Sequence, residues 1–587
     1  MFLPTRFLLA LSAACALSSF VFGAEPAADL VVMEGRVLTV DEKFSVVEAV
    51  AIRGNRFVYA GDAAGAKHFV GPQTRVLNAR GASVVPGLFE THVHAVGVAR
   101  DQADEPFRQL SSLADLRVWL REKDARTKPG EWIRIIRVDL TRFKEGRFPT
   151  REELDEMLPA RPVVFDWSYA GINQVQVLNT AALKAGGITR DTADPAQGRI
   201  VRDAQGEPTG MLRNARILIE RHLPAAPKPD RAALLTGLER VHRHYHAVGI
   251  TSINERRADA DTYALYQELK SQGRLAVRTT LTMGIGYQGG AGNALKQLQH
   301  LPYQPGEGDD WLRLGPLKIR IDGGLLYGTA YLREPFLAEG SARFYEIPGG
   351  QNRGELITPA AEVTAIFRAA HAAGWQLSAH VAGDAGVDVV LDALEAANRD
   401  RPIAPRRFNL IHAYLPNAEA AERARKLGAV VDTQPVMYYK DGDALLETLG
   451  AERAARMYGL KEWLKAGVKI AINADHMMGL DPNQALQPYN PFLALYVAVS
   501  RKTESGREHG PQQKVSREQA LRMMTADAAY LSFDETSRGS IAVGKLADLA
   551  ILSDDYMTCP EERIRQIQVV TTVVDGKVVY EGATATR

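Results

Sequence analysis

The sequence predicts an α/β fold whose centre is a (β/α)8 barrel of the TIM type, and three observations predict it. Apolar runs of strand length recur along the chain. Alanine-rich helical stretches separate them, for example 359–371 and 417–427. Strands that alternate with helices form a parallel sheet, and enough repeats close it into a barrel. Metal-ligating side chains also stand at the ends of several runs, which is where barrel enzymes place their active sites.

Eight candidate strands can be counted without forcing any. In chain order they are 84–94, 249–254, 276–282, 314–324, 375–380, 408–412, 429–434 and 468–475. Eight strands are the number that closes such a barrel. The chain has 587 residues, whereas a bare barrel needs roughly 250, so additional domains are expected.

Both ends of the chain read as antiparallel strands. Residues 28–77 and about 539–582 alternate apolar and polar residues, with turn signals between the alternating runs. Asp575-Gly576, between two apolar runs, indicates a β-hairpin.

An insertion separates barrel strands one and two, at about residues 98–230. It carries helical stretches, an apolar run at 162–165 and a proline-rich exit at 223–229. We expect this insertion to form a subdomain that covers the mouth of the barrel.

Residues 1–23 are predicted to be a signal peptide. Arg6 precedes the apolar run 7–22, and 21–23 ahead of Ala24 is similar to a cleavage site. The run is shorter than a membrane-spanning helix needs, so no stable membrane anchor is expected. The sequence therefore predicts an exported protein, periplasmic or secreted.

The mature chain is electrically balanced. The full sequence carries a formal net charge of +1, and removing Arg6, the single charged residue of the signal peptide, lowers it to 0. Such a chain shows no bulk electrostatic reason to bind nucleic acid or an anionic membrane. We expect a small-molecule substrate as its partner, and the sequence leaves open a monomer or a homo-oligomer.

Two histidines end the first barrel strand. His92 and His94 are spaced i, i+2, so both imidazoles point to the same side of a strand. Four more residues of ligand type stand at the ends of later strand-like runs: Lys318, His380, His412 and Asp475. Imidazole and carboxylate ligands suit Zn2+, with manganese or iron as alternatives.

The order of these residues resembles that of the amidohydrolase superfamily: HxH on strand one, Lys on strand four, His on strands five and six, and Asp on strand eight. Within it, the chain is most similar to amidohydrolase family 3, the group of N-substituted formamide deformylases and exoenzyme-regulator-type metal-dependent hydrolases. The segments that carry the resemblance are 86–94, 318–330, 380–388 and 539–549. The resemblance covers nearly the whole mature chain.

The resemblance implies a domain organisation. The two chain ends are expected to pair into one small β-sandwich, with 24–85 as its first half and 534–587 as its second. The metal-dependent hydrolase barrel would then occupy 86–533.

The resemblance also implies one or two metal ions, held by two groups of ligands: His92, His94 and Asp475 in one, His380 and His412 in the other. Lys318 would take up carbon dioxide as a carbamate that bridges both ions, because a lysine ammonium has no lone pair to offer. In the alternative, Lys318 is an ordinary charge that pairs with Asp322, which leaves a single metal ion.

A hydrolytic mechanism follows from this ligand set. A metal ion here would lower the pKa of a bound water to about 7 and so supply hydroxide for attack on a carbonyl group. Asp475 is the expected catalytic residue, which takes the proton from the nucleophile and passes it to the departing amine. Four residues near the barrel mouth are expected to contact substrate: Tyr327, Thr329, Arg333 and His476.

The favoured reaction is hydrolysis of a carbon–nitrogen bond in a non-peptide amide, a formamide or a cyclic amide. An ester or lactone hydrolase would use the same metal site, and the sequence does not separate the two. Deamination is disfavoured, because deaminases of the resembled superfamily carry glutamate three residues after the strand-five histidine, where this chain has Gly383. An intact set of six ligands argues against a non-catalytic binding protein.

A second group of histidines precedes strand two. His242 and His246 share one face of a helical stretch. No further ligands accompany them in the sequence, so we expect a solvated helix face there and no metal site.

Overall fold

The structure of the chain is a computed structural model that describes residues 26–104, 107–169, 172–225, 228–286 and 290–582. The predicted signal peptide, 1–23, lies outside the described residues. Among the helices of the described segments, none combines the length and the apolar composition that crossing a bilayer requires.

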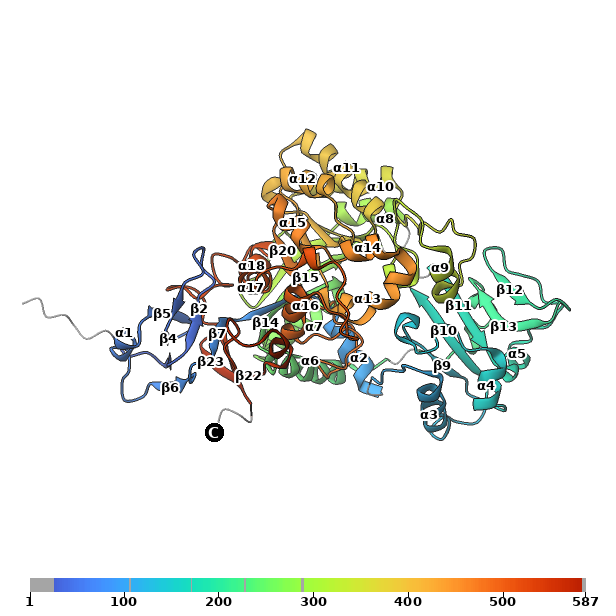
Figure 1. Cartoon of the computed structure of the whole chain (residues 1–587), viewed down its shortest axis with the longest axis horizontal. Helices are drawn as coiled ribbons and strands as arrows, with labels where there is room; N and C mark the ends of the chain where they lie inside the picture. Colours follow the sequence, from blue (N-terminus) through green and yellow to red (C-terminus); the bar gives the residue numbers. More distant parts are fainter. Residues whose placement is uncertain (1–25, 105–106, 170–171, 226–227, 287–289, 583–587) are drawn as a thin grey trace, which may run out of the picture.

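An eight-stranded parallel sheet forms a nearly closed barrel at the centre of the molecule (Figure 1). Its strands follow one another in chain order: β8 (Leu88–Val93), β14 (Ile250–Ala258), β15 (Arg278–Gly284), β16 (Leu312–Arg320), β17 (Leu377–Val381), β18 (Asn409–His412), β19 (Val430–Thr433) and β20 (Ile470–Ile472). A backbone bridge between Val93 and His476 joins the first strand to the segment after the last. The predicted barrel is thus confirmed.

Helices surround the barrel. Between or after the strands run α2 (Ala95–Asp104), α6 (Arg231–His246), α7 (Ala260–Ser271), α8 (Gly290–Gln299), α9 (Ala338–Tyr345), α10 (Ala360–Ala372), α11 (Asp384–Asp400), α12 (Ala418–Lys426), α13 (Pro435–Leu449), α14 (Ala451–Arg456), α15 (Leu460–Ala466), α16 (Pro491–Ser500), α17 (Arg517–Met523) and α18 (Ala526–Leu531). Capping residues in the local sequence determine where several of these helices begin. In α12 the side chain of Asn417 accepts the amide of Ala420 and so caps an otherwise unpaired N–H.

Two sheets built from the chain ends lie on one side of the barrel (Figure 1, left). One sheet has the order β5-β4-β1-β6, with β1 (Leu30–Met33), β4 (Ala49–Arg53), β5 (Arg56–Gly61) and β6 (Arg75–Asn78); α1 (Ala63–Lys67) follows β5. The other has the order β23-β22-β21-β7-β2-β3, with β2 (Arg36–Leu38), β3 (Val46–Val47), β7 (Ser83–Pro86), β21 (Leu549–Leu552), β22 (Val569–Val574) and β23 (Lys577–Glu581). Because β21 pairs with β7, strands from both ends share one sheet.

Two details of this region follow from the sequence. Asp575 and Gly576 both have positive φ, 54° and 73°, and they connect β22 to β23 as the expected hairpin turn. The run predicted as one strand, 84–94, is divided at Gly87. Its first part is β7 in the sheet of the chain ends and its second part is β8 in the barrel. One continuous segment therefore connects that sheet to the barrel.

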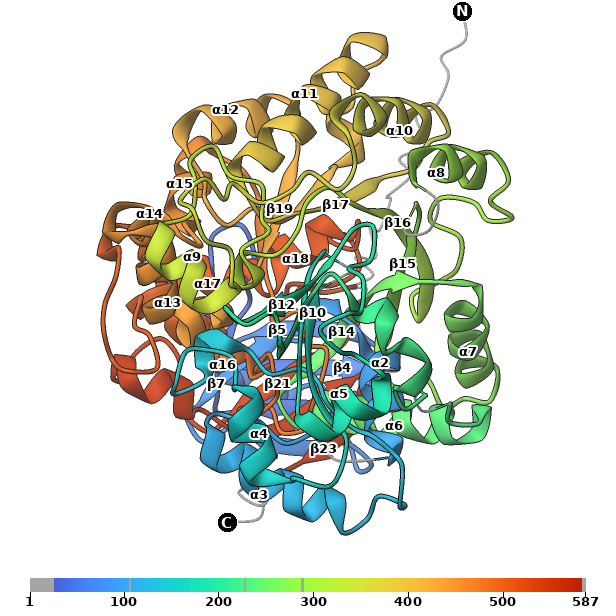
Figure 2. The ribbon, with the colours of Figure 1, turned by 90° about the vertical axis from the view of Figure 1, so that its right-hand side faces the viewer.

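The insertion forms a sheet of its own on the opposite side of the barrel (Figure 1, right). It contains α3 (Leu113–Asp124), β9 (Ile133–Ile135), α4 (Arg151–Met157), β10 (Val163–Tyr169), β11 (Ile172–Leu178), α5 (Thr180–Gly186), β12 (Arg199–Arg202) and β13 (Pro208–Arg213), with strand order β12-β13-β11-β10-β9. Figure 2 shows these strands in front of the barrel when it is viewed from this side.

A buried ion pair holds the insertion to the barrel. Arg142 makes two hydrogen bonds of 2.7 Å to Asp441 on α13, the helix that follows barrel strand β19. The side chains are 5% and 0% exposed. Because loops that follow barrel strands rim the mouth, this contact places the insertion against the mouth of the barrel.

Candidate metal centre

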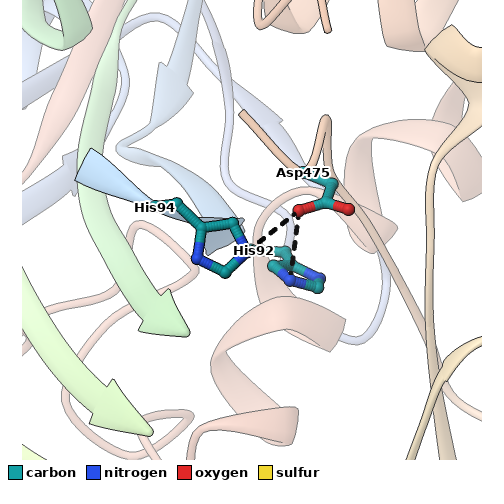
Figure 3. Close-up of side chains that lie close together, drawn as sticks. All are labelled: His92, His94 and Asp475. Carbon is teal, nitrogen blue, oxygen red and sulfur yellow. Dashed lines mark ion pairs between the residues drawn. The ribbon is translucent and has the colours of Figure 1, made fainter. Parts of the chain in front are cut away.

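His92, His94 and Asp475 converge at one end of the barrel (Figure 3). The Asp475 Oδ1 atom lies 3.2 Å from His92 Nε2 and 3.4 Å from His94 Nε2. The three ligand atoms lie within 4.8 Å of one another, so they can bind a single ion. His92 lies on β8, His94 follows directly after its last residue, and the aspartate comes from the segment just after β20, the last strand.

The backbone at two of the predicted ligands is strained. Asp475 has φ 57° and His412 has φ 78°, both in the left-handed region that side chains other than glycine rarely adopt. Each lies at the end of its barrel strand, where the turn redirects the side chain. Strain of this kind clusters at functional sites and persists where surrounding contacts enforce it. At Asp475 one such contact is its amide, which donates to Asn473 Oδ1 at 3.1 Å.

Lys318 lies in direct contact with His92. Its Nζ atom is 2.9 Å from His92 Nε2, and the residue is buried. Burial lowers the pKa of Lys318 to about 7, with Asp475 acting in the opposite direction. A neutral amine is the form that reacts with carbon dioxide, and it is well populated near neutral pH.

Asp322, the alternative partner of Lys318, is engaged elsewhere. Its carboxylate accepts the backbone N–H groups of Tyr331 at 2.9 Å and of Ala382 and Gly383 at 2.8 Å each. Asp322 therefore organises the loop after β16 and the start of α11. The structure favours Lys318 as a member of the candidate metal centre over a simple ion pair with Asp322.

His380 and His412 face each other beside this group. Their Nδ1 and Nε2 atoms are 2.8 Å apart. His380 donates its Nε2–H to the carbonyl of Gly323 at 2.9 Å, and His412 Nδ1 lies 2.8 Å from Gln434 Oε1. The lone pair of His380 therefore lies on Nδ1, toward His412, and His412 presents a lone pair to a metal ion when its own proton is on Nδ1.

The two groups are adjacent. The ring centroids of His92 and His412 are 5.6 Å apart. The structure thus brings together all six residues predicted as metal ligands: His92, His94, Lys318, His380, His412 and Asp475.

Electrostatics favours metal binding over proton binding at the four imidazoles. Burial lowers the pKa of each ring, to about 4 for His412 and well below the usual range for His92 and His380. The pKa of His94 is also lowered by burial. Neutral imidazoles are the form that ligates metal ions, so no proton has to be displaced at neutral pH.

The donor set also fits a divalent metal ion because one of its atoms lacks a partner. Asp475 Oδ1 is buried and accepts no hydrogen bond from the residues that the structure describes. A buried carboxylate oxygen without a donor is costly, and here it faces the Nε2 atoms of His92 and His94. A cation among these three acceptors would offset that cost.

The residues predicted to contact substrate fall into two groups. Thr329, Arg333 and His476 are engaged by protein groups. Thr329 Oγ1 accepts the amide of Gly324 at 3.0 Å, and Arg333 forms two hydrogen bonds of 2.6 and 2.5 Å with Asp388.

His476 is fully buried beside the barrel strands. Its Nδ1 lies 2.9 Å from the hydroxyl of Tyr245, and its Nε2 lies 2.7 Å from the carbonyl of Gly479. The sequence places His476 next to Asp475, but the backbone bridge to Val93 fixes it within the barrel wall.

Tyr327 is the predicted contact that lies at the boundary of the barrel and the insertion. Its ring lies 5.1 Å from that of Trp167 on β10, and its hydroxyl is 3.4 Å from Asp139. It belongs to the loop after β16, which also carries the Gly323 carbonyl bound by His380. Substrate contact by Tyr327, Thr329, Arg333 and His476 remains a prediction.

Sequence reasoning did not single out Gln434, whose side chain contacts His412 directly. A signal was present. Gln434 is a polar residue at the end of a strand-like run, the same position in the pattern that identified His380 and His412.

Comparison with known proteins agrees with this geometry. The chain matches the Amidohydrolase family over residues 75–580. It belongs to the amidohydrolase family. Membership of this family implies a metal-dependent hydrolase, and the resemblance read from the sequence is confirmed.

Two relatives are similar over most of their length. The N-substituted formamide deformylase of Arthrobacter pascens is 29% identical over 564 residues, which cover 94% of this chain and 98% of that protein. Protein LONG AFTER FAR-RED 3 of Arabidopsis thaliana is 29% identical over 576 residues, 94% of this chain and 92% of that protein. A solved structure of an uncharacterized metal-dependent hydrolase from Pyrococcus horikoshii OT3 has the same fold, with a TM-score of 0.64 and 21% identity over 91% of this chain and 99% of that one.

Proposed function

We propose that this amidohydrolase is an exported enzyme that uses Zn2+ to hydrolyse a carbon–nitrogen bond in a small non-peptide amide, formamide or cyclic amide. The observation that carries the proposal is the convergence of His92, His94 and Asp475 beside buried Lys318. The name of the Arthrobacter pascens relative, an N-substituted formamide deformylase, supports an amide as the substrate class.

In this proposal His92, His94 and Asp475 would hold one metal ion, and His380 and His412 would hold a second. Lys318, as a carbamate, would be a further ligand of the centre. The metal ions, when bound, supply a water of lowered pKa and polarise the substrate carbonyl.

Asp475 moves the proton. A carboxylate has two oxygens, so one can contact the metal ion while the other takes up a proton. The carboxylate accepts a proton from the attacking water and delivers it to the departing amine, as one group serves in turn as base and acid. His92 and His94 flank Asp475, with their Nε2 atoms 3.2 and 3.4 Å from its Oδ1 atom.

Deamination fits the structure poorly. At Gly383, where deaminases of the superfamily carry glutamate, an added Cβ would lie 2.0 Å from the carbonyl oxygen of Tyr331. Backbone atoms cannot yield at that distance without a shift of the loop after β16. The position therefore excludes the side chain that deamination would need.

A substrate panel tests the proposal. Amides, formamides, cyclic amides, esters, lactones and aminopurines are assayed with zinc-loaded protein and after removal of metal by a chelator. We expect chelator-sensitive turnover of amides or formamides. Turnover of esters or lactones alone would replace the proposal with an ester hydrolase on the same site, and turnover that survives complete metal removal would refute both.

Export has its own test. The cleavage signal at 21–23 supports secretion across a membrane. The mature protein is expected outside the cytoplasm with Ala24 at its N-terminus, measured by cell fractionation and intact mass. A full-length chain that stays in the cytoplasm would contradict this part of the proposal.

A further inference from the structure

A chain of buried side chains leads from the barrel interior to His412. Gln434 Oε1 lies 2.8 Å from His412 Nδ1. Its amide nitrogen donates to Asn473 Oδ1 at 2.9 Å, and the Asn473 amide nitrogen donates to Asp432 Oδ1 at 2.6 Å. Asp432 and Gln434 are fully buried and Asn473 nearly so, which makes each of these hydrogen bonds costly to lose.

An ion pair determines which group donates and which accepts in this series of hydrogen bonds. Arg256 Nη2 lies 2.7 Å from Asp432 Oδ2, and both side chains are fully buried. An ionised carboxylate only accepts hydrogen bonds, so Asn473 turns its NH2 toward Asp432 and its oxygen toward Gln434. Gln434 in turn directs its NH2 to Asn473 and its oxygen to His412. Because an amide oxygen cannot donate, the proton of His412 lies on Nδ1 and the lone pair on Nε2.

Asn473 also contacts Asp475, the ligand residue after the last barrel strand. Asn473 Oδ1 accepts the backbone N–H of Asp475 at 3.1 Å, in addition to the amide of Gln434. One buried side chain thus links the aspartate at the end of the last strand to the histidine at the end of β18.

We propose that Gln434 and Asn473 are positioning residues that keep His412 in its Nδ1–H tautomer, so that Nε2 is available as a metal ligand. The role in metal binding rests on the proposed function, whereas the choice of tautomer rests on the hydrogen bonds alone. Such outer partners of a metal-ligating histidine fix its tautomer and ring orientation.

Tyr414 determines the tautomer of His412 when Gln434 is replaced. Its hydroxyl lies 2.9 Å from His412 Nδ1 and 3.0 Å from Gln434 Oε1. While Gln434 is present, the hydroxyl donates to the amide oxygen and its own oxygen faces the Nδ1–H. Once that acceptor is removed, the hydroxyl donates to Nδ1, the proton of His412 moves to Nε2, and the nitrogen that faces His380 loses its lone pair.

The test compares the full-length protein with Gln434→Met, which keeps the size of the side chain and removes its acceptor. In metal-free protein, 15N spectra of the histidine rings report the tautomer, and His412→Asn assigns the signal. We expect the Nδ1–H form in the unmodified protein and the Nε2–H form in Gln434→Met. Zinc titration against a chelator is expected to show an affinity at the second position about 10 to 100 times weaker.

Matched variants distinguish a specific effect on the His412 tautomer from a general loss of structure. Gln434→Glu keeps an oxygen acceptor toward His412 and is expected to keep the Nδ1–H form. Gln376→Met removes a different buried amide, which donates to the Arg407 carbonyl at 2.7 Å, and is expected to leave the tautomer and zinc affinity unchanged. Should Gln434→Met fail to fold, Asn473→Leu, which removes the group that orients Gln434, is expected to produce the same switch.

Two results would overturn the proposal: an Nδ1–H tautomer that persists in Gln434→Met, or an equal loss of zinc affinity in Gln376→Met. The tautomer is read without metal, so it stands apart from catalysis. A protein that shows the switch but binds no zinc would refute the zinc-dependent hydrolase of the proposed function and leave the positioning role in place.

Discussion

The chemical state of Lys318 decides between one metal ion and two. Its amine lies 2.9 Å from His92, and burial lowers its pKa to about 7, which favours carbamate formation with carbon dioxide. We expect the protein purified with bicarbonate to contain about two metal ions per chain, and Lys318→Ala to contain one or none. Elemental analysis of both proteins measures this.

The control removes a lysine that belongs to a different ion pair. Lys514 forms an ion pair with Glu508 on the surface, and Lys514→Ala is expected to keep the metal content of the unmodified protein. One metal ion in both the unmodified protein and Lys318→Ala would refute the carbamate on Lys318 and indicate a mononuclear hydrolase.

Asp475 is the residue on which the proton transfer depends. Asp475→Asn keeps the size of the side chain and an oxygen that can still contact the metal, but it removes the base. We expect kcat to fall by a factor of about 10² to 10⁴, the usual contribution of a positioned acid–base group. Metal content is measured alongside the rate. Full activity with metal retained would show that another group carries the proton.

At the scale of single elements, helix α6 carries an unusual buried side chain. The sequence suggested a solvated face for His242 and His246, and this prediction is wrong, because both are buried. α2 packs against α6, and the ring of Tyr266 on α7 lies 6.2 Å from that of His242. Neither ring nitrogen of His242 has a hydrogen-bond partner among the described residues.

A leucine is therefore expected to suit this position better than the native histidine. Burying a polar group without a partner costs about 1–3 kcal/mol, so His242→Leu should raise the free energy of unfolding by about 1 kcal/mol. Urea unfolding measures the change. His246, whose Nε2 lies 3.1 Å from the Ala276 carbonyl, is the matched control, and His246→Leu should destabilise the protein. Equal effects of the two substitutions would contradict the argument.

The ion pair between Arg142 and Asp441 predicts how firmly the insertion is held. Asp441→Ala leaves a buried guanidinium without its main partner, which costs about 3–5 kcal/mol. We expect faster hydrogen exchange in 139–148 and a matching loss of stability in urea. Glu447→Ala on the same helix breaks a pair that is half exposed and should cost less than about 1 kcal/mol. Similar losses in both variants would show that burial of the pair is unimportant.

The strands of the barrel and the residues at their ends could be predicted because the information is local. Each buried strand is a short apolar run, and a polar residue at its end stands out against that background. The partners of those residues could not be predicted in the same way. Gln434 and Asn473 are 39 positions apart and meet only because β19 and β20 pair in parallel. The burial of His242 likewise depends on packing against α2, which is distant in sequence from α6.

The whole molecule is held together by a sheet that both ends of the chain complete. β21 lies between β22 and β7, and the apolar side chains of Leu549, Ile551 and Val573 pack in the core between the two sheets. β7 continues through Gly87 into the first barrel strand, so a sheet left without β21 would expose an unpaired edge beside the barrel.

A chain that ends after Asp548 tests this coupling. It lacks β21, β22 and β23, and Arg278 at the start of β15 loses Asp575, which it contacts at 3.0 Å. We expect this chain to be insoluble or to unfold well below the full-length protein, as measured by soluble yield and thermal unfolding. A chain that ends after Gly582 keeps all three strands and should match the full-length protein. If the shorter chain were equally stable, the barrel would fold without its terminal sheet, and the pairing of the chain ends would serve another purpose.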